Sequence, residues 1–349
     1  MNDMKIIPVF NQTFRTEVTE MSQVGEARRM AFEISAFIGL SETEAGTVSI
    51  IVSEIAKNLI KHAGCGEVLI SPVQYRDEFW IDILGLDKGP GIAGMAQCMQ
   101  DGYSTTGSPG TGLGAVKRLS TIFDIISAPA AGTAVLSRLI RKQEKVKQLP
   151  PLMDIGVVNV PINSEQVSGD GWAVAESSGR TVLMAADGLG HGVLASDAAR
   201  AAEKVFREQS FLGPTELLEY IHNSIKHTRG AAVAIAEVTH AKNMLKYSGI
   251  GNITGILHTA EKSRNMVSMN GTAGGEARKM QEFAYPFAPA ENSRQPLIIM
   301  HSDGIATISA LDRYPGIENR HPALIAGIVY KDFRRGRDDA MVLVAKKRP

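Results

Sequence analysis

Several features are scarce in this chain of 349 residues, and each absence excludes a class of protein. Only two cysteines are present, Cys65 and Cys98, and their spacing fits neither a disulfide framework nor a zinc site. No run of 18 apolar residues occurs, and the first ten residues lack the pattern of a secretory signal. The sequence therefore predicts a cytoplasmic protein without a membrane span.

An excess of charge of one sign is also lacking. Lys plus Arg and Asp plus Glu each number 37, so no broad basic field favours nucleic acid or an anionic membrane as a partner. Hydrophobic residues make up 44% and charged residues 21%, as in folded globular proteins. A chain of this length has room for two domains, each with its own core.

The expected domain boundary is residues 141–152. A charged run there is followed by Leu-Pro-Pro-Leu, which is typical of a short, semi-rigid linker. A surface loop within one domain is the alternative. The predicted domains are residues 1–140 and 153–349.

In the first domain, a helix is expected over residues 23–40, and a second helix follows a capping box formed by Ser41 and Glu44. The second helix carries an apolar stripe at helical spacing: Val48, Ile51, Val52, Ile55 and Leu59. Strands are expected at residues 5–14, 67–73, 78–86, 121–127 and 134–140. This order predicts helices on one face of a mostly antiparallel sheet.

After the linker, strand patterns dominate. Strands are expected at residues 154–160, 171–176, 181–186, 231–238, 244–257, 296–301 and 341–345. Helices are expected at residues 193–208, 215–227 and 320–327. Strands in blocks with helices between them predict a sheet sandwich flanked by helices, so the whole chain is of the α+β class.

Three polar residues lie on one face of the second helix expected in the first domain. Glu54, Asn58 and His62 follow one another at i, i+4 steps and therefore share one helix face. Two glycine motifs follow, Asp-Lys-Gly-Pro-Gly at residues 87–91 and Gly-Thr-Gly-Leu-Gly at residues 110–114. Glycines let the backbone approach phosphate, although a solvated helix face and simple turns would give the same residues.

The order of these motifs resembles the N, G1 and G2 boxes of the GHKL (Bergerat-fold) ATP-binding superfamily, an α/β sandwich. Ser-Glu-Ile-Ala-Lys-Asn-Leu-Ile from Ser53 and Asp-Gly-Tyr-Ser-Thr-Thr-Gly from Asp101 look most like the switch serine kinases of bacterial partner-switching modules. The resemblance covers nearly all of residues 5–140.

The resemblance implies a role for each matching residue. Asn58 would hold the Mg²⁺ that accompanies ATP, and Glu54 would accept the proton of an incoming serine hydroxyl. Asp87 would bind the adenine amino group, with Thr133 as a further adenine-side contact. The glycines would shape the base pocket and wrap the phosphates: Gly89, Gly91, Gly110, Gly112 and Gly114. His62 is either a phosphate neighbour or a polar residue that ends the helix.

Acidic residues recur at strand ends in the second domain. They are Asp170, Asp187, Asp303 and the pair Asp338 and Asp339. Asp-Gly pairs are common in turns, but gathered carboxylates would repel one another by roughly 1–4 kcal/mol per close pair near 4 Å unless a cation lies between them. All-oxygen ligation suits Mg²⁺ or Mn²⁺ rather than zinc.

The set Ser-Gly-Asp, Ala-Asp-Gly-x-Gly-His-Gly, Ser-Asp-Gly and Arg-Asp-Asp-Ala-x-Val-Leu-Val resembles the PP2C-like (PPM) phosphatases of the bacterial sporulation and stress-response branch, which form an αββα sandwich. The resemblance covers about residues 153–347. It implies that two Mn²⁺ or Mg²⁺ ions activate a water for attack on phosphoserine or phosphothreonine. The implied ligands are Asp170, the catalytic Asp187, the Gly188 carbonyl, Asp303 and Asp339.

Two nearby residues are open to interpretation. His191 either gives a proton to the leaving group or supports the glycine-rich loop, while Asn252 is expected to close a strand turn. We find no acidic residue that supplies a third metal site, so two ions are expected.

Together the resemblances predict a bifunctional serine kinase and phosphatase that acts on a STAS-type antagonist protein. A downstream regulator or sigma-factor module is a further expected partner. The alternative is an ATP-binding module that sequesters a regulator without kinase activity and carries a phosphatase. A histidine kinase fragment is disfavoured, because no dimerising helix with a phosphoacceptor histidine precedes the ATP-binding region. One half acting only as a regulator of the other is a further possibility.

Overall fold

The structure is a computed structural model that describes residues 11–75, 78–92, 112–141, 151–177, 179–259, 263–277, 279–288, 295–309 and 311–348. Its contacts divide the chain into two compact units. The first comprises Met1–Val146 with Ala310–Arg320, and the second comprises Lys147–Ser309 with His321–Pro349. Within the described ranges, no helix has the length and apolar character needed to cross a membrane.

Two long helices, α1 (Met21–Phe37) and α2 (Glu42–Asn58), pack against each other in the first unit. The predicted capping box is confirmed at α2, where the Glu44 amide donates to Ser41 Oγ and the Ser41 amide donates to the Glu44 carboxylate. Such a cap contributes about 0.5–2 kcal/mol. It fixes where α2 begins, and therefore which of its residues face the sheet.

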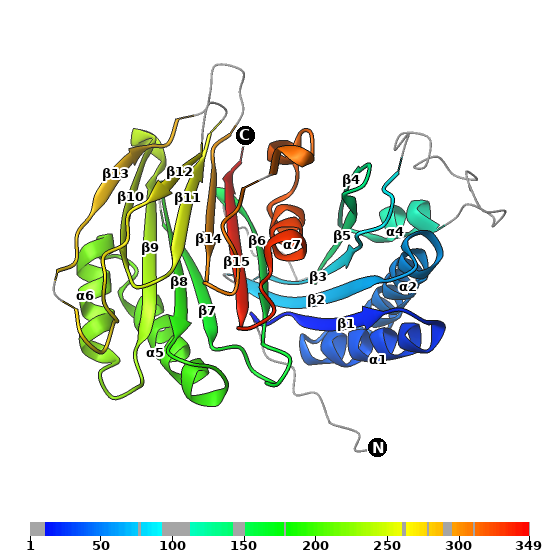
Figure 1. The fold of residues 1–349 in the computed structure, drawn as a ribbon, viewed down its shortest axis with the longest axis horizontal. Helices are drawn as coiled ribbons and strands as arrows, with labels where there is room; N and C mark the ends of the chain where they lie inside the picture. The colour runs from blue at the N-terminus through cyan, green and yellow to red at the C-terminus, as the bar shows by residue number, and fades with distance from the viewer. Residues whose placement is uncertain are drawn as a thin grey trace. The chain divides into compact units, whose positions relative to one another are not determined.

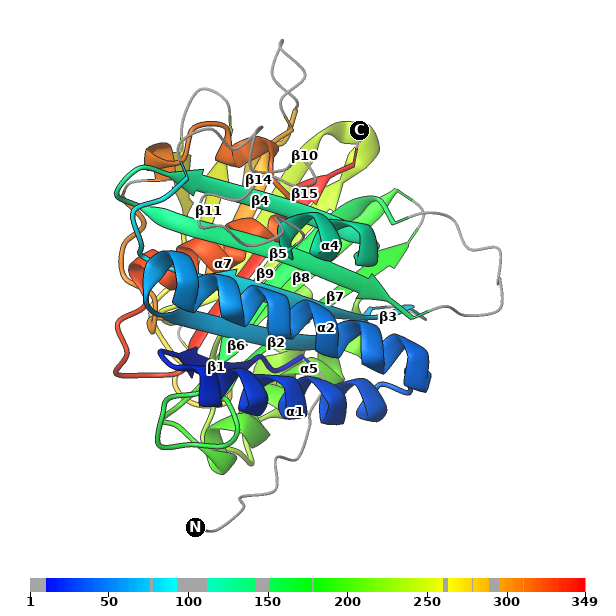
Figure 2. The same ribbon diagram turned by 90° about the vertical axis from the view of Figure 1, so that its right-hand side faces the viewer.

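The sheet of the first unit has five antiparallel strands in the order β1-β2-β3-β5-β4. Their bounds are β1 Phe14–Val18, β2 Gly66–Tyr75, β3 Glu78–Leu86, β4 Ile122–Ala128 and β5 Gly132–Ile140. The helices cover one face of this sheet, as Figures 1 and 2 show. Apolar residues of α1 and α2, including the stripe from Val48 to Leu59, form the core between the layers. The predicted layout of helices on one face of an antiparallel sheet is confirmed. The strand expected at residues 5–14 is misplaced, because β1 begins only at Phe14 and residues 11–13 are not in a strand, while residues 5–10 lie outside the described ranges.

One ion pair is buried in this sheet. The Arg138 guanidinium donates to both carboxylate oxygens of Asp82 at 2.6 and 2.7 Å and lies over the Trp80 ring. The Trp80 indole also donates to Asp82. Because each charge is fully partnered, removing one member would cost about 3–5 kcal/mol.

The segment Ala310–Arg320 groups with the first unit although it follows the strands of the second in sequence. The Tyr314 hydroxyl donates to the Ala131 carbonyl at 3.0 Å, and Arg320 pairs with Asp124 at 3.2 Å. The sequence analysis assigned this segment to the second domain. The two contacts lie beyond the reach of local sequence patterns, since they join residues more than 180 positions apart.

The second unit contains two antiparallel five-stranded sheets. One has the order β13-β10-β9-β8-β7, with β7 Asp170–Ser177, β8 Arg180–Gly188, β9 Ala231–Thr239, β10 Met244–Ile250 and β13 Phe283–Pro286. The other has the order β12-β11-β14-β15-β6, with β6 Met153–Val160, β11 Thr254–His258, β12 Ser263–Met266, β14 Leu297–His301 and β15 Ala340–Lys347.

Helices α5 (Val193–Gln209) and α6 (Pro214–Ser224) pack on the first of these sheets, and α7 (Pro322–Phe333) packs on β6 and β15 of the other. This is the expected αββα sandwich (Figure 1). The single strand expected at residues 244–257 is wrong: the chain turns at Gly251, whose φ is +88°, and β10 and β11 belong to different sheets. Gly251 marks the turn in the sequence, but nothing local shows the change of sheet.

Candidate active sites

The first candidate site lies at the end of α2. Gly112, the first residue of α4 (Gly112–Leu119), lies against this end, because a Cβ built on it would be 3.5 Å from both the Asn58 amide and the Glu54 carboxylate. Asn58 Nδ2 is buried and has no hydrogen-bond partner in the part of the chain that the structure describes. A buried amide without a partner costs free energy in the folded state, so this side chain fits a role in binding a ligand.

The second half of this site surrounds Asp87. Its Oδ1 accepts hydrogen bonds from the backbone amides of Gly89 at 2.8 Å and Thr133 at 3.1 Å. The Thr133 hydroxyl lies 2.9 Å from that of Ser127, which also accepts from the Ile92 amide. Asp87, Gly89 and Thr133, separated by up to 46 residues, are thereby brought together. The sequence analysis missed Ser127, for which no motif gave a signal.

Of the other residues predicted to bind the nucleotide, only some lie in the described part of the chain. Gly91 lies beside the turn between β4 and β5, and Gly114 lies in the first turn of α4. Gly110 lies outside the described residues, as does the predicted lid from Asp101. His62 lies in a π-helical turn, Leu59–Ala63, that follows Asn58 directly. Burial and Lys61 lower the pKa of His62 and the Asp87 carboxylate opposes this effect, so His62 is close enough to Asp87 to sense its charge.

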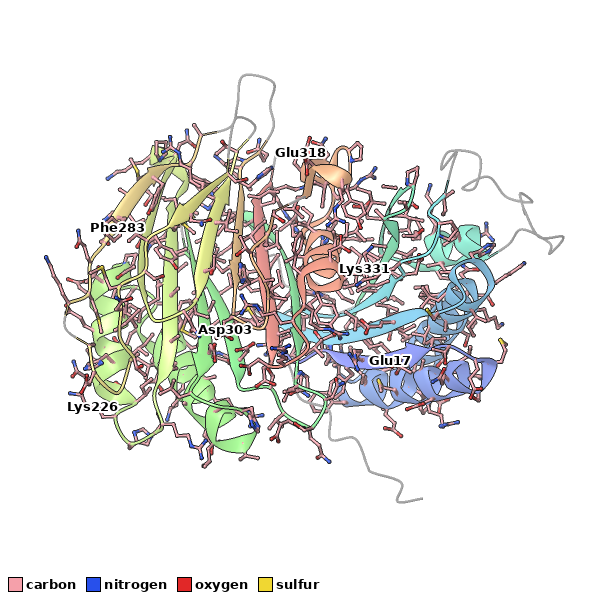
Figure 3. The ribbon with its side chains drawn as sticks, in the orientation of Figure 1. Glu17, Lys226, Phe283, Asp303, Glu318 and Lys331 are labelled. Carbon is pink, nitrogen blue, oxygen red and sulfur yellow. The ribbon has the colours of Figure 1, made fainter. Side chains whose placement is uncertain are left out.

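The acidic residues of the second unit meet where strands of both sheets end. Asp170 on β7 pairs in register with Asp187 on β8. From the other sheet, the Ser302 hydroxyl just after β14 donates to Asp170 at 2.6 Å. Asp303, which follows Ser302, is close to Asp187, and Asp338 is close to both Asp170 and Asp187. Four distant stretches of sequence therefore contribute to one cluster. Figure 3 labels Asp303.

Asn252 joins two members of this acidic cluster. Its amide donates to Asp303 at 2.8 Å and also hydrogen-bonds Asp187. The expectation that Asn252 closes a turn between strands fits its place between β10 and β11, but it left out this contact. The Gly-Ile-Gly-Asn sequence gives no sign that the amide reaches two carboxylates.

Asp338 and Asp339 differ in what their carboxylates contact. The two oxygens of Asp339 accept the backbone amides of Ile162 and Gly169, both at 2.7 Å. The side chain of Asp338 lines a cavity of about 390 Å³ together with Asp303, Arg335 and Arg337. The sequence analysis missed both arginines, although the run Arg-Arg-Gly-Arg-Asp-Asp places them directly before the acidic pair.

Close backbone approach explains two glycines of the cluster. A Cβ on Gly304 would be 1.8 Å from the Asp339 carbonyl oxygen, and one on Gly188 would be 2.1 Å from the Ala195 carbonyl oxygen. Any side chain at Gly304 would push the segment that follows β14 away from the backbone of Asp339. Glycine there keeps Asp303 beside the acidic pair.

Burial raises the pKa of three carboxylates in this cluster. Burial and the nearby Asp187 raise the pKa of Asp170 well above its ordinary value, and the Ser302 hydrogen bond opposes the rise. Burial, followed by Asp303 and Asp338, raises the pKa of Asp187 to about 7. Burial also raises the pKa of Asp339, against the effect of its two backbone hydrogen bonds.

These features fit a divalent cation in chemistry and position. Carboxylates whose pKa is raised by burial and by one another are poorly compensated, and a cation bound among them would remove that cost. No three acidic, histidine or cysteine side chains of the described ranges converge closely enough to form a ready-made cage. Small rotations of the carboxylates would therefore accompany binding.

Comparisons with known proteins find separate matches for the two units. Residues 18–138 match the histidine kinase-like ATPase domain family, and residues 177–348 match the stage II sporulation protein E (SpoIIE) family. The serine/threonine-protein kinase RsbT of Bacillus subtilis (strain 168) is 33% identical over 109 residues, which span 31% of this chain and 82% of that protein. This chain belongs to the RsbT family.

The RsbT-like unit is a GHKL-type domain, and the unit that follows it is a PP2C-type serine/threonine phosphatase domain. The phosphoserine phosphatase RsbX of Bacillus subtilis (strain 168) is 23% identical over 142 residues, spanning 40% of this chain and 69% of that protein. A solved structure described as "The bacterial stressosome: a modular system that has been adapted to control secondary messenger signaling" matches with a TM-score of 0.50 and 22% identity. It covers 55% of this chain and 98% of the other chain, and shows the fold alone.

Proposed function

We propose that this RsbT-family chain adds phosphate to, and removes it from, a serine of one STAS-type antagonist protein in a partner-switching circuit. The observation that carries the proposal is the gathering of Asp170, Asp187, Asp303 and Asp338 from separate strand ends of one unit, in a chain whose other unit is kinase-like. Two Mn²⁺ or Mg²⁺ ions, when bound there, would supply a water activated for attack on phosphorus.

The side chains of the second unit have distinct roles in this proposal. Asp187 would hold both ions, the Gly188 carbonyl would bind one of them, and Asp303 would bind the other. Asp170 would bind directly or through water. Asp339 was predicted as a ligand and stays a prediction, but both of its oxygens already accept backbone amides. We therefore infer that Asp338, which shares a cavity with Asp303, provides the ligand at this end of the cluster.

The same cavity supports a place for the phosphoryl group. Arg335 and Arg337 line it beside Asp303 and Asp338. Guanidinium groups bind phosphate oxygens through paired hydrogen bonds, so these arginines would hold and orient the phosphoserine. Asn252 would keep Asp187 and Asp303 facing the same point.

In the first unit, the end of α2 would transfer phosphate from ATP. Asn58 would hold the Mg²⁺ of the nucleotide, and Glu54 would accept the proton of the substrate serine. Asp87, held by the Gly89 and Thr133 amides, would accept a hydrogen bond from the adenine amino group. The nearness of Gly112, at the start of α4, to Glu54 and Asn58 supports phosphate binding at this point.

The test follows phosphate in both directions. The chain is incubated with labelled ATP and a candidate STAS protein, first with Mg²⁺ and then with added Mn²⁺. We expect labelled serine on the STAS protein, and release of labelled phosphate that increases when Mn²⁺ is added. Stable ATP-dependent binding of a regulator without any phosphate transfer would instead favour the sequestering alternative.

A further inference from the structure

An exposed histidine and a glutamate form a hydrogen-bonded pair next to the acidic cluster. His191 Nδ1 lies 2.7 Å from Glu165 Oε1, and the two side chains are 57% and 27% exposed. His191 follows the Asp-Gly pair at residues 187–188, which is proposed to bind metal, in the glycine-rich loop before α5. The imidazole is close enough to Asp339 for its charge to act on that carboxylate.

The loop that carries Glu165 is fixed from below by Asp339. One oxygen of Asp339 accepts the Ile162 amide and the other accepts the Gly169 amide, so a single buried carboxylate closes residues 162–169 at both ends. Within the loop, the Glu165 amide donates to the Ile162 carbonyl at 2.9 Å. These contacts fix the backbone of the loop that carries Glu165.

The loop that carries His191 is shaped to receive this carboxylate. Gly192 has a φ of +74°, and a Cβ built on it would lie 2.7 Å from Glu165 Oε2. Glycine at this position therefore leaves room for Glu165 to reach the ring. Charged groups face this loop from three other segments: Glu165 pairs with His191, Asp339 lies directly before β15, and Arg229 lies beside Gly190.

The pairing determines which nitrogen of His191 faces solvent. When Nδ1–H donates to Glu165, the Nε2 position is the one left to meet a bound phosphoprotein. A protonated ring held in this way can give its Nε2 proton away and keep the Nδ1 proton on Glu165. A histidine free to rotate would present either nitrogen.

We propose that Glu165 is a positioning residue that holds His191 as the proton donor to the leaving serine oxygen. The inference rests on the phosphatase function of this unit. In this step the attacking water loses one proton to solvent and its oxygen bonds to phosphorus. The bond from phosphorus to the serine oxygen breaks, and the Nε2 proton of His191 passes to that oxygen. The products are serine and hydrogen phosphate, and solvent reprotonates the ring.

Glu165 also lies near the first turn of α5, where a carboxylate stabilises a helix. A purely structural role of this kind would affect all substrates equally and would not depend on His191. The two roles can therefore be separated by changing the leaving group of the substrate and by measuring which nitrogen of His191 carries the proton.

The first test compares two substrates in the full chain with Mn²⁺. A phosphoserine peptide needs a proton on its poor leaving group, whereas p-nitrophenyl phosphate needs it far less. We expect Glu165→Ala to lower kcat for the peptide by about tenfold and His191→Asn by about a hundredfold, with a loss for p-nitrophenyl phosphate at least tenfold smaller in each case. Glu165→Gln, which keeps an acceptor oxygen, should recover part of the loss.

The second test measures the ring itself in the metal-free protein by ¹⁵N NMR of histidine. Wild-type neutral His191 should carry its proton on Nδ1, the less common tautomer, and Glu165→Ala should move it to Nε2. Glu282→Gln is the matched control, because it removes another glutamate that forms an exposed ion pair, with Lys246 at 2.9 Å in the same unit. Glu282→Gln should leave both the kcat values and the tautomer of His191 as in the wild type.

Three results would overturn the proposal: equal losses on both substrates, an unchanged tautomer in Glu165→Ala, or losses that multiply in the double variant with His191→Asn. In the double variant we expect no loss beyond that of His191→Asn alone. If wild-type protein hydrolysed neither substrate, the phosphatase function would fail, and the tautomer measurement would still decide whether Glu165 holds His191.

Discussion

The two candidate sites are built in different ways. At the nucleotide site, Glu54 and Asn58 stand one turn apart on a single helix, and Asp87 is held by two backbone amides. The candidate phosphatase site instead gathers carboxylates from four separate stretches, and burial together with their mutual repulsion raises the pKa of Asp170 and Asp187. The first site therefore holds its polar groups on one helix and by backbone hydrogen bonds, whereas the second needs cations to relieve its charge. Substitutions in each site test this difference.

The largest expected effect is loss of phosphatase activity in Asp187→Asn. The change removes a central carboxylate, so phosphate release from a phosphoserine protein should fall below detection. Phosphate transfer from ATP should remain, because the residues proposed for it lie in the other unit. The metal-free variant should be at least as stable as the wild type in thermal denaturation, since one repelling charge is gone. Loss of both activities in a folded variant would contradict independent sites.

The matching change in the first unit is Glu54→Ala. Loss of the general base should lower the rate of serine phosphorylation by about 10²–10⁴-fold, while ATP binding and phosphatase activity stay near wild type. Lys57→Ala is the control, because Lys57 pairs with Glu54 at 3.1 Å on the exposed side of α2 and is given no role in phosphate transfer. If Glu54→Ala phosphorylates as fast as Lys57→Ala, Glu54 is not the base.

A comparison of Asp338→Asn with Asp339→Asn separates metal binding from support of the fold. Asp338→Asn should weaken Mn²⁺ binding with little change in stability. Asp339→Asn cannot accept both backbone amides, so it should lower the free energy of unfolding by about 1.5–3 kcal/mol. Calorimetry and urea denaturation give the two quantities. The reverse pattern would restore Asp339 as the main ligand.

The pH dependence of stability gives the smallest expected effect. The pKa of Asp187 is about 7 in the fold against an ordinary value of 3.8, so the folded protein binds this proton more tightly than the unfolded chain does. The contribution of Asp187 to the free energy of unfolding is therefore fully present below about pH 4 and is lost as the pH rises through 7. The melting temperature measured in a chelator should fall between pH 5 and 8, and Asp187→Asn should reduce that fall. If the melting temperature of the wild type rose over this range while that of Asp187→Asn did not, the raised pKa of Asp187 would be contradicted.

Much of this comparison could be predicted from the sequence. Helical spacing placed Glu54 and Asn58 on one face, and the capping box fixed the start of α2. The order of the Asp-Gly motifs predicted the acidic cluster, because each motif follows an apolar strand pattern. These are local signals, and both the fold class and the family of the RsbT-like unit followed from them.

What could not be predicted depends on contacts between distant residues. Nothing near Asn252 in sequence shows that its amide bridges Asp187 and Asp303. Adjacent aspartates look equivalent in a motif, yet Asp339 accepts two backbone amides while Asp338 lines the cavity. The pairing of Glu165 with His191 spans 26 positions and likewise requires the folded loops.

Mn²⁺ binding by the whole chain, measured by calorimetry in wild type and Asp187→Asn, tests the central claim most directly. We predict that the wild type binds two ions in the absence of nucleotide and that Asp187→Asn loses this binding while its affinity for ATP is unchanged. Unaltered Mn²⁺ binding by a folded Asp187→Asn protein would contradict the claim that these carboxylates hold the ions.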